Sequence, residues 1–304
     1  MLRTAKTGQP PLQYGTTAGD ETLRKLTSRR LAHLDGRPAK AKAYQPSRMM
    51  ITHGSQQLLY ILTEILFDPG DIVLVEDPSY FVYLGITQSH GLRARSIPME
   101  EDGIDLPHLE ATLEALKQSG ELPRLKALYL VSYHSNPTGT TTSASKKADA
   151  LKLLRRYEKA AGHPIYLLED AAYRELCFSG EDTPSALTMD RAGDRVIYTS
   201  TYSKPFATGV RIGYGLLPGP LLTAALRVKG NHDFGTTNFL QQLISRALSS
   251  GAYETHVKTL RTRYAKKAGA MVRACREHLP ENVKWTKPTG GLYVWACMPA
   301  RVKT

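Results

Sequence analysis

Short apolar segments alternate with amphipathic segments along most of the chain. The apolar segments are short, rich in β-branched residues and followed by polar residues, which is typical of buried strands. We expect strands at 72–77, 127–132, 165–170 and 196–201. Apolar residues at helical spacing predict helices over 20–34, 55–67, 105–117 and 144–161. Strands of this kind that alternate with helices predict a mainly parallel sheet with helices on both faces.

Composition narrows the class of protein. Hydrophobic residues make up 41% of the 304 residues, which is enough for a substantial core. No apolar run approaches the length of a membrane span, and the N-terminal residues lack the apolar core of a secretory signal. The three cysteines, Cys177, Cys275 and Cys297, are widely separated. Such spacing favours reduced thiols in a cytoplasmic protein over disulfides or a zinc site, and the histidines show no metal-binding spacing.

The net charge of +12 raises the question of an acidic partner. The excess is dispersed, with some concentration in 258–276, where apolar residues recur at helical spacing. A solvated basic face of an amphipathic helix explains this pattern, and a nucleic-acid-binding patch is the less favoured alternative. We therefore expect no nucleic-acid partner and no membrane association.

Reactive side chains follow each of the predicted strands. Tyr80 comes after the first strand and Asn136 after the second. Asp170 ends the third strand and is followed by Tyr173, and Lys204 follows the fourth. Parallel sheets bind ligands beyond the carboxyl ends of their strands, so these groups are expected to converge on one pocket.

A lysine at a buried strand end is costly unless its amine is used. A desolvated amine can attack a carbonyl, and pyridoxal 5'-phosphate (PLP) offers an aldehyde together with three other groups to be bound. Its ring nitrogen needs an anion, its phenolate oxygen needs donors, and its phosphate needs an arginine, hydroxyls and free N–H groups. The candidates are Lys204 for the aldehyde, Asp170 for the ring nitrogen, Tyr173 and Asn136 for the phenolate, Tyr80 for stacking, and Arg211, Ser203, Thr201, Gly54, Ser55 and Gln56 for the phosphate.

Each candidate also has an ordinary structural explanation. Lys204 by itself would be read as a surface lysine, Asp170 as a helix cap, and Tyr80 as a core residue. The sequence around Asn136 is a good generic turn. The functional interpretation depends on the joint occurrence of these residues at equivalent strand ends.

Several motifs resemble those of fold-type I PLP-dependent enzymes. They are "GSQQ" (54–57), "PGDIVLVEDPSY" (69–80), "NPTG" (136–139), "EDAAYREL" (169–176), "TYSKPFATGVRIGYG" (201–215) and "TGGLYVWACMP" (289–299). They are most similar to class I/II aminotransferases of the 2-aminoadipate, aromatic and branched-chain group, from about residue 12 to residue 299. Where that family usually has Ser-Phe-Ser-Lys and Pro-Gly, this chain has Thr201-Tyr202-Ser203-Lys204 and Thr208-Gly209.

The resemblance implies a fold and a domain organisation. The fold is the aspartate aminotransferase-like α/β three-layer sandwich, with a large PLP-binding domain at 1–252 and the start of a small α+β domain at 253–304. "GGLYVW" (290–295) is expected to be a strand of the small domain. Family members extend further at both ends, so we expect a truncated chain without the arginine that binds the substrate carboxylate.

The resemblance also implies an activity. A PLP-dependent aminotransferase would move an amino group between an amino acid and a 2-oxo acid by a ping-pong mechanism, with Lys204, Asp170 and Tyr173 as catalytic residues. Tyr14 would reach the phosphate in the neighbouring subunit of a homodimer. Three alternatives stay open: a MocR-type regulator's aminotransferase-like domain, a lyase or decarboxylase of the same fold, and an inactive fragment.

Overall fold

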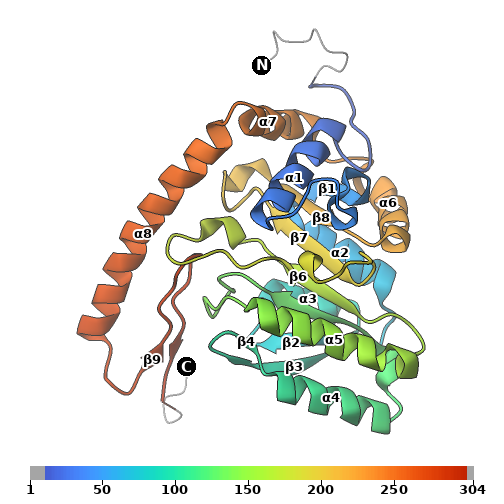
Figure 1. The fold of residues 1–304 in the computed structure, drawn as a ribbon, viewed down its shortest axis with the longest axis vertical. Coiled ribbons are helices and arrows are strands. Elements are labelled where there is room, and N and C mark those ends of the chain that lie inside the picture. Colours follow the sequence, from blue (N-terminus) through green and yellow to red (C-terminus); the bar gives the residue numbers. More distant parts are fainter. Residues whose placement is uncertain (1–10, 300–304) are drawn as a thin grey trace.

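A large mixed sheet forms the centre of the computed structural model, which describes residues 11–299 (Figure 1). Its strand order is β1-β8-β7-β6-β5-β2-β3-β4. The strands are β1 (Met49–His53), β2 (Ile72–Asp77), β3 (Arg93–Glu100), β4 (Gly103–Ile104), β5 (Leu125–Val131), β6 (Tyr166–Asp170), β7 (Val196–Thr201) and β8 (Ile212–Leu216).

The four strands predicted from the sequence are the adjacent strands β7, β6, β5 and β2. They pair in parallel with one another, and β3 extends this parallel block beyond β2. The antiparallel pairs, β1 with β8, β8 with β7 and β3 with β4, lie toward the two edges. The predicted mainly parallel sheet is confirmed.

Helices cover both faces of the sheet. The α-helices are α1 (Glu21–Leu34), α2 (Gly54–Leu66), α3 (Phe81–Ser89), α4 (Leu106–Gln118), α5 (Ala144–Ala161), α6 (Gly219–Asp233), α7 (Asn238–Ser249) and α8 (Ala252–His278). Short 3-10 helices occur at Lys42–Tyr44, Pro46–Arg48, Leu122–Arg124, Arg174–Leu176, Ala186–Thr188 and Thr208–Val210. Apolar side chains of α1, α4, α5 and α7 share one buried cluster with the sheet, and those of α2, α3 and α6 share the other. The three-layer arrangement is therefore confirmed.

The last described part of the chain is the long helix α8 followed by a hairpin of β9 (Lys284–Trp285) and β10 (Ala296–Cys297) (Figure 1). The predicted strand at 290–295 is wrong. The start of this segment bonds to the chain after β6, where Gly291 N–H donates to Leu176 O and Phe178 N–H donates to Thr289 O. Its last residue, Trp295, accepts the Thr286 N–H just before β10 begins. The predicted domain boundary at residue 252 coincides with the start of α8, and the division into two domains stays a prediction.

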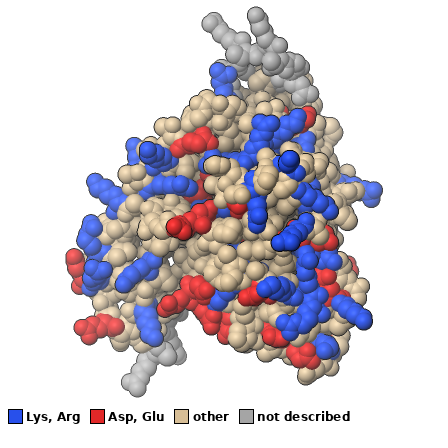
Figure 2. Space-filling model, viewed as in Figure 1, with Lys and Arg blue, Asp and Glu red and all other residues tan. Residues whose placement is uncertain are grey.

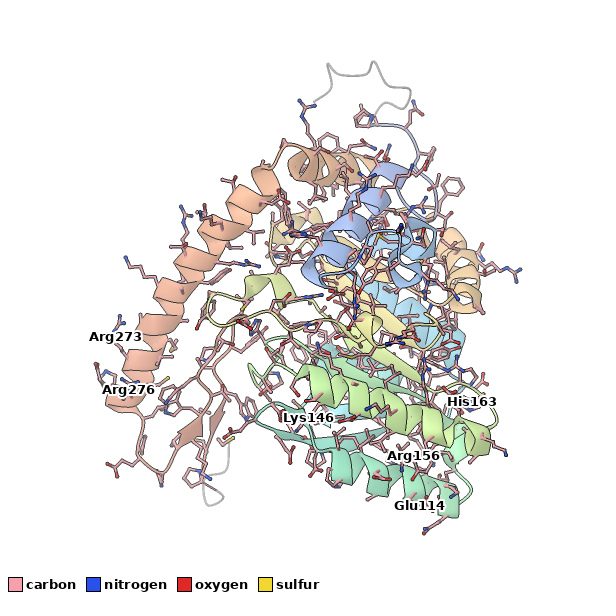
Figure 3. The ribbon with its side chains drawn as sticks, in the orientation of Figure 1. Glu114, Lys146, Arg156, His163, Arg273 and Arg276 are labelled. Atoms are coloured by element: carbon pink, nitrogen blue, oxygen red, sulfur yellow. The ribbon has the colours of Figure 1, made fainter. Side chains whose placement is uncertain are left out.

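The surface carries mixed charge. Lysine and arginine side chains are spread over the visible face with acidic side chains among them (Figure 2). Arg273 and Arg276 lie near the end of α8, away from the outer helices that carry Glu114 and Arg156 (Figure 3). Across residues 11–299, no helix is both long and apolar enough to cross a membrane. The three cysteines are free thiols.

Candidate cofactor site

The amine and the carboxylate predicted to act together lie close together. Lys204 follows β7 in a turn, and its Nζ lies 5.5 Å from the centroid of the Tyr173 ring. Asp170 ends the neighbouring strand β6 and is only 3% exposed. The positive charge of Lys204 lowers the pKa of Asp170, which partly offsets the effect of burial.

Asp170 is held by two donors. The Tyr129 hydroxyl donates to Oδ2 over 3.1 Å, and Ala172 N–H donates to Oδ1 over 3.0 Å. Burial raises the pKa of Asp170 to about 6, so the group is largely ionised at neutral pH. The bond from Ala172 shows that Asp170 also caps the backbone that follows. Tyr129 was not predicted as a site residue, because its only sequence signal is its place in an apolar strand.

An anion-binding cradle forms where α2 begins. The first N–H groups of the helix, those of Gly54, Ser55 and Gln56, have no hydrogen-bond partner among the residues described. Arg211 Nη1 donates to the Ser203 hydroxyl over 3.1 Å, and Arg211 Nη2 lies 2.8 Å from where a Cβ on Gly54 would stand. Free N–H groups, a helix N-terminus and a guanidinium are the groups that bind phosphate.

Two glycines allow the close approach on which this cradle depends. Gly54 has φ +70°, which other residues rarely adopt. A Cβ on Gly213 in β8 would lie 2.4 Å from Ser55 N, so only glycine lets the strand pass this close to the helix start. This close contact explains sterically why the motif at 201–215 has a glycine at position 213.

A side-chain network supports the start of α2. Gln57 Oε1 accepts the His53 N–H, and Gln57 Nε2 donates to Asp233. His53 Nδ1 lies 3.1 Å from the same carboxylate, which also pairs with Lys229. His53 lines one cavity of about 400 Å³ with Gln56 and Arg211. Gln57 and Asp233 were missed as site residues, because nothing in the local sequence shows that α6 ends beside α2.

Three phenols surround the same space. Tyr173 and Tyr293 have hydroxyl oxygens 3.3 Å apart and rings in edge-to-face contact. Burial raises the pKa of Tyr80, the charges of Asp170 and Tyr293 also raise it, and the charge of Arg211 lowers it. Tyr293 was not predicted, although it stands in the "TGGLYVW" motif.

Three further predicted residues, Asn136, Thr201 and Tyr14, lie in different surroundings. Asn136 is buried in the loop after β5, and within the described part of the chain its amide has no hydrogen-bond partner. The Thr201 hydroxyl donates to Ile212 O and accepts from Ser203 N–H, so it braces the turn that holds Lys204. Tyr14 is 82% exposed, and its ring packs on Phe234 rather than on the cradle of its own chain.

These residues fit PLP. The cradle matches a phosphate, the buried Asp170 matches a ring nitrogen that must stay protonated, and the amine of Lys204 matches an aldehyde. The unpartnered N–H groups and the unpartnered Asn136 amide supply donors that nothing in residues 11–299 uses.

Comparison with known proteins agrees with this fit. Residues 2–303 match the family model of aminotransferase class I and II. Aromatic-amino-acid aminotransferase 1 of Thermococcus litoralis is 32% identical over 96% of this chain and 67% of its own length. Kynurenine aminotransferase of Pyrococcus horikoshii, solved in complex with PMP, superposes with a TM-score of 0.89 at 32% identity, covering 98% of this chain and 70% of that chain. The uncharacterized HTH-type transcriptional regulator YisV of Bacillus subtilis is 27% identical over 97% of this chain and 57% of its own length.

The fold and the site therefore define a fold-type I enzyme that uses PLP. The chain belongs to the class I and II aminotransferase family, and it is a PLP-dependent aminotransferase. The predictions of the fold, the cofactor and the enzyme class are confirmed.

Proposed function

We propose that Lys204 forms the covalent bond to the cofactor and moves the substrate proton during amino-group transfer. The observation that supports this most directly is the position of its Nζ over the Tyr173 ring, where its charge acts on Asp170, in the residue directly after Ser203 of the cradle. Bound PLP supplies an electron sink for the charge left when an amino acid loses its α-proton. The Nζ of Lys204 would take that proton and deliver it to the cofactor carbon that receives the amino group.

The other residues bind and orient the cofactor. Arg211, Ser203, Ser55 and the free N–H groups at the start of α2 hold the phosphate. Asp170 keeps the ring nitrogen protonated, since its buried charge is best satisfied by a cation. Tyr173 and Asn136 donate to the phenolate oxygen, and Tyr80 packs on the ring.

The substrates of this proposal are an amino acid and a 2-oxo acid that use the same site in turn, which gives ping-pong kinetics. A homodimer completes the site, with Tyr14 contributed to the partner's phosphate. The exposed apolar pair Tyr14 and Phe234, with the neighbouring exposed Leu12, supports such an interface. The three free thiols support a cytoplasmic enzyme.

Lys204→Ala tests the assignment. The variant should lose the absorption band of the covalently bound cofactor and all amino-group transfer, while borohydride should no longer fix the cofactor to the protein. Lys152→Ala is the matched control, because Lys152 is 75% exposed on α5. A Lys204→Ala protein that keeps the band would refute the assignment.

A lyase or decarboxylase of the same fold would use the same cofactor contacts. Supplying an amino donor with a 2-oxo acid and measuring the new amino acid separates the two, because elimination or decarboxylation consumes the donor without aminating the acceptor. A regulatory role, as the relative YisV suggests by its name, would instead show salt-sensitive binding to a specific DNA fragment.

A further inference from the structure

A second buried carboxyl group lies next to Asp170. Glu76, near the end of β2, is 1% exposed. Its Oε2 accepts the Val131 N–H over 2.9 Å, whereas Oε1 is buried and has no hydrogen-bond partner in residues 11–299. An ionised carboxylate with an unpartnered oxygen in this position would be very costly. A neutral carboxylic acid lowers that cost.

The sheet brings Glu76 and Asp170 together through one residue. Strand β5 lies between β2 and β6, and Val131, which donates to Glu76, is the β5 residue paired with Asp170. Two residues earlier in β5, Tyr129 donates its hydroxyl to Asp170. The two carboxyl groups therefore approach the same end of β5 from its two sides.

Within residues 11–299, the groups around Glu76 supply no compensating positive charge. On the β3 side its backbone partner is Ile97, and on the β5 side lies Tyr129, on whose ring Tyr83 of α3 packs with centroids 4.1 Å apart. Asp170 on β6 is negative, and the positive charge of Lys204 acts on Asp170, whose pKa it lowers. No ion pair in the described chain includes Glu76. Burial raises the pKa of Glu76, the hydrogen bond from Val131 N–H lowers it, and the charge of Asp170 adds to the rise, which together bring the pKa to about 8.

We propose that Glu76 is a positioning residue that holds a proton at neutral pH, so that it adds no negative charge of its own beside Asp170. Its functional meaning rests on the proposed role of Asp170. An ionised Glu76 would place a second negative charge close to Asp170 and would favour protonation of Asp170. Protonation of Glu76 removes that effect. Asp170 then stays ionised and able to pair with the ring nitrogen.

Infrared spectroscopy of the full-length chain without added cofactor tests the proton directly. The wild-type protein should show the C=O stretch of a buried protonated carboxyl at pH 7, and the band should titrate away near pH 8. Glu76→Gln, which keeps an acceptor for Val131 N–H, should lack that band. Asp170→Asn should keep the band and move its titration to lower pH, by about half a unit or more, because a neighbouring negative charge is gone.

The outcomes separate this proposal from the proposed function. The proposal is overturned if Glu76→Gln leaves the infrared band in place, or if Asp170→Asn does not shift its titration. If Glu76→Gln fails to fold, the Asp170→Asn titration still decides, because an unrelated carboxyl would not respond to the loss of Asp170. Neither result depends on Lys204 or on amino-group transfer, so the proposed function can fail independently.

The pH dependence of the enzyme with bound PLP provides a second test. At pH 7, Glu76→Gln should bind PLP within about twofold of the wild-type protein, because both side chains are neutral. Above about pH 8, ionised Glu76 adds negative charge near Asp170, so the wild-type protein should keep the protonated absorption form of the bound cofactor to higher pH than the variant. A purely structural role predicts the same difference at both pH values, and that result would also overturn the proposal.

Discussion

Arg211 Nη1 donates a hydrogen bond to the Ser203 hydroxyl over 3.1 Å, which ties the end of the β7–β8 connection to the turn that carries Lys204. The same guanidinium lies against the start of α2, with Nη2 2.8 Å from the position of a Cβ on Gly54. Three chain segments thus meet around one positive charge and the free N–H groups of a helix. In the proposed function, this meeting point would set the distance between the Lys204 amine and the bound phosphate.

Gly54→Ala should weaken cofactor binding strongly. The new Cβ would displace Arg211 Nη2, and the left-handed backbone, with φ +70°, disfavours any side chain. We expect the Kd for PLP to rise at least about tenfold, which corresponds to about 1.4 kcal/mol, as measured by equilibrium dialysis.

Gly36→Ala is the matched control. Gly36 has φ +59° but no atom within 4 Å of a Cβ, so the substitution adds a similar backbone cost without crowding the cradle. It should lower the free energy of unfolding by about 1 kcal/mol and leave the Kd for PLP unchanged. Equal affinity losses in both variants would show that backbone strain, and not the contact with Arg211, causes the effect.

Tyr129→Phe should raise the pKa of Asp170. Burial raises the pKa of Asp170, and the bond from the Tyr129 hydroxyl to the carboxylate is one of the interactions that keep the pKa at about 6. Losing the donor favours the protonated acid, so the acid limb of the kcat/KM profile should move to higher pH, with activity at pH 6 reduced several-fold and activity at pH 8 changed less.

Tyr83→Phe controls for the loss of a buried hydroxyl. The ring of Tyr83 packs on Tyr129, but its buried hydroxyl has no partner among the described residues, so its removal leaves Asp170 untouched. The pH profile of this variant should overlie that of the wild-type protein. A shift of the same size in both variants would argue against the specific bond to Asp170.

The sequence predicts the centre of the sheet better than its edges. Strands β2, β5, β6 and β7 are buried on both faces, so their apolar runs are nearly continuous and easy to recognise. In β3 the pattern is hidden, because most of its side chains are exposed or only partly buried and several are charged. The turn at Gly290 and Gly291 was misread as a strand, because alternation indicates a β conformation but not whether a partner strand exists.

Only some residues of the candidate site could be predicted from the sequence. Residues that follow strands, such as Lys204 and Asp170, could be placed because topology fixes where strand ends point. Glu76, Tyr129 and Asp233 could not be placed, since their roles arise from contacts between segments far apart in the sequence. A buried polar residue within an apolar strand, such as Glu76, is the signal available for such residues.

His134 should make the protein sensitive to acid. It is 3% exposed and packs against Gly290 and Gly291, where added Cβ atoms would lie 2.3 and 2.6 Å from its side chain. Burial lowers the pKa of His134 to about 4, and the charge of Arg261 adds to the shift. The unfolded chain therefore binds more protons than the folded chain between pH 6.5 and about 4, so this group's contribution to stability falls as the pH falls through that range.

The comparison with His134→Asn isolates the effect, since Asn tolerates the positive φ at this position. Glu76 and Asp170 have raised pKa values and act in the opposite direction, but they are the same in both proteins. Between pH 7 and pH 5, urea unfolding should show the wild-type protein losing more stability than the variant, by up to about 1.4 kcal/mol per pH unit. His108→Asn, at an exposed position on α4, should keep the wild-type slope.

Lys147 and Glu169 form an ion pair on the opposite face of the sheet from Asp170. Their charged atoms are 3.0 Å apart and both side chains are fully buried. Adjacent residues of a strand point to opposite faces, so Glu169 lies behind the site while Asp170 lies in it. Lys147 also donates to Pro184 O, and Glu169 Oε2 accepts Ala186 N–H.

Lys147→Met should therefore cost about 3–5 kcal/mol of unfolding free energy, because it leaves the charge of Glu169 buried and unpaired. Adding Glu169→Gln, which keeps an acceptor for Ala186 N–H, should restore most of this loss in urea unfolding and leave the Kd for PLP unchanged. Lys152→Met breaks an exposed pair with Asp149, whose atoms are 2.8 Å apart, and should cost at most about 0.5 kcal/mol. A double variant no more stable than Lys147→Met alone would show that lost packing, rather than the unpaired charge, accounts for the destabilisation.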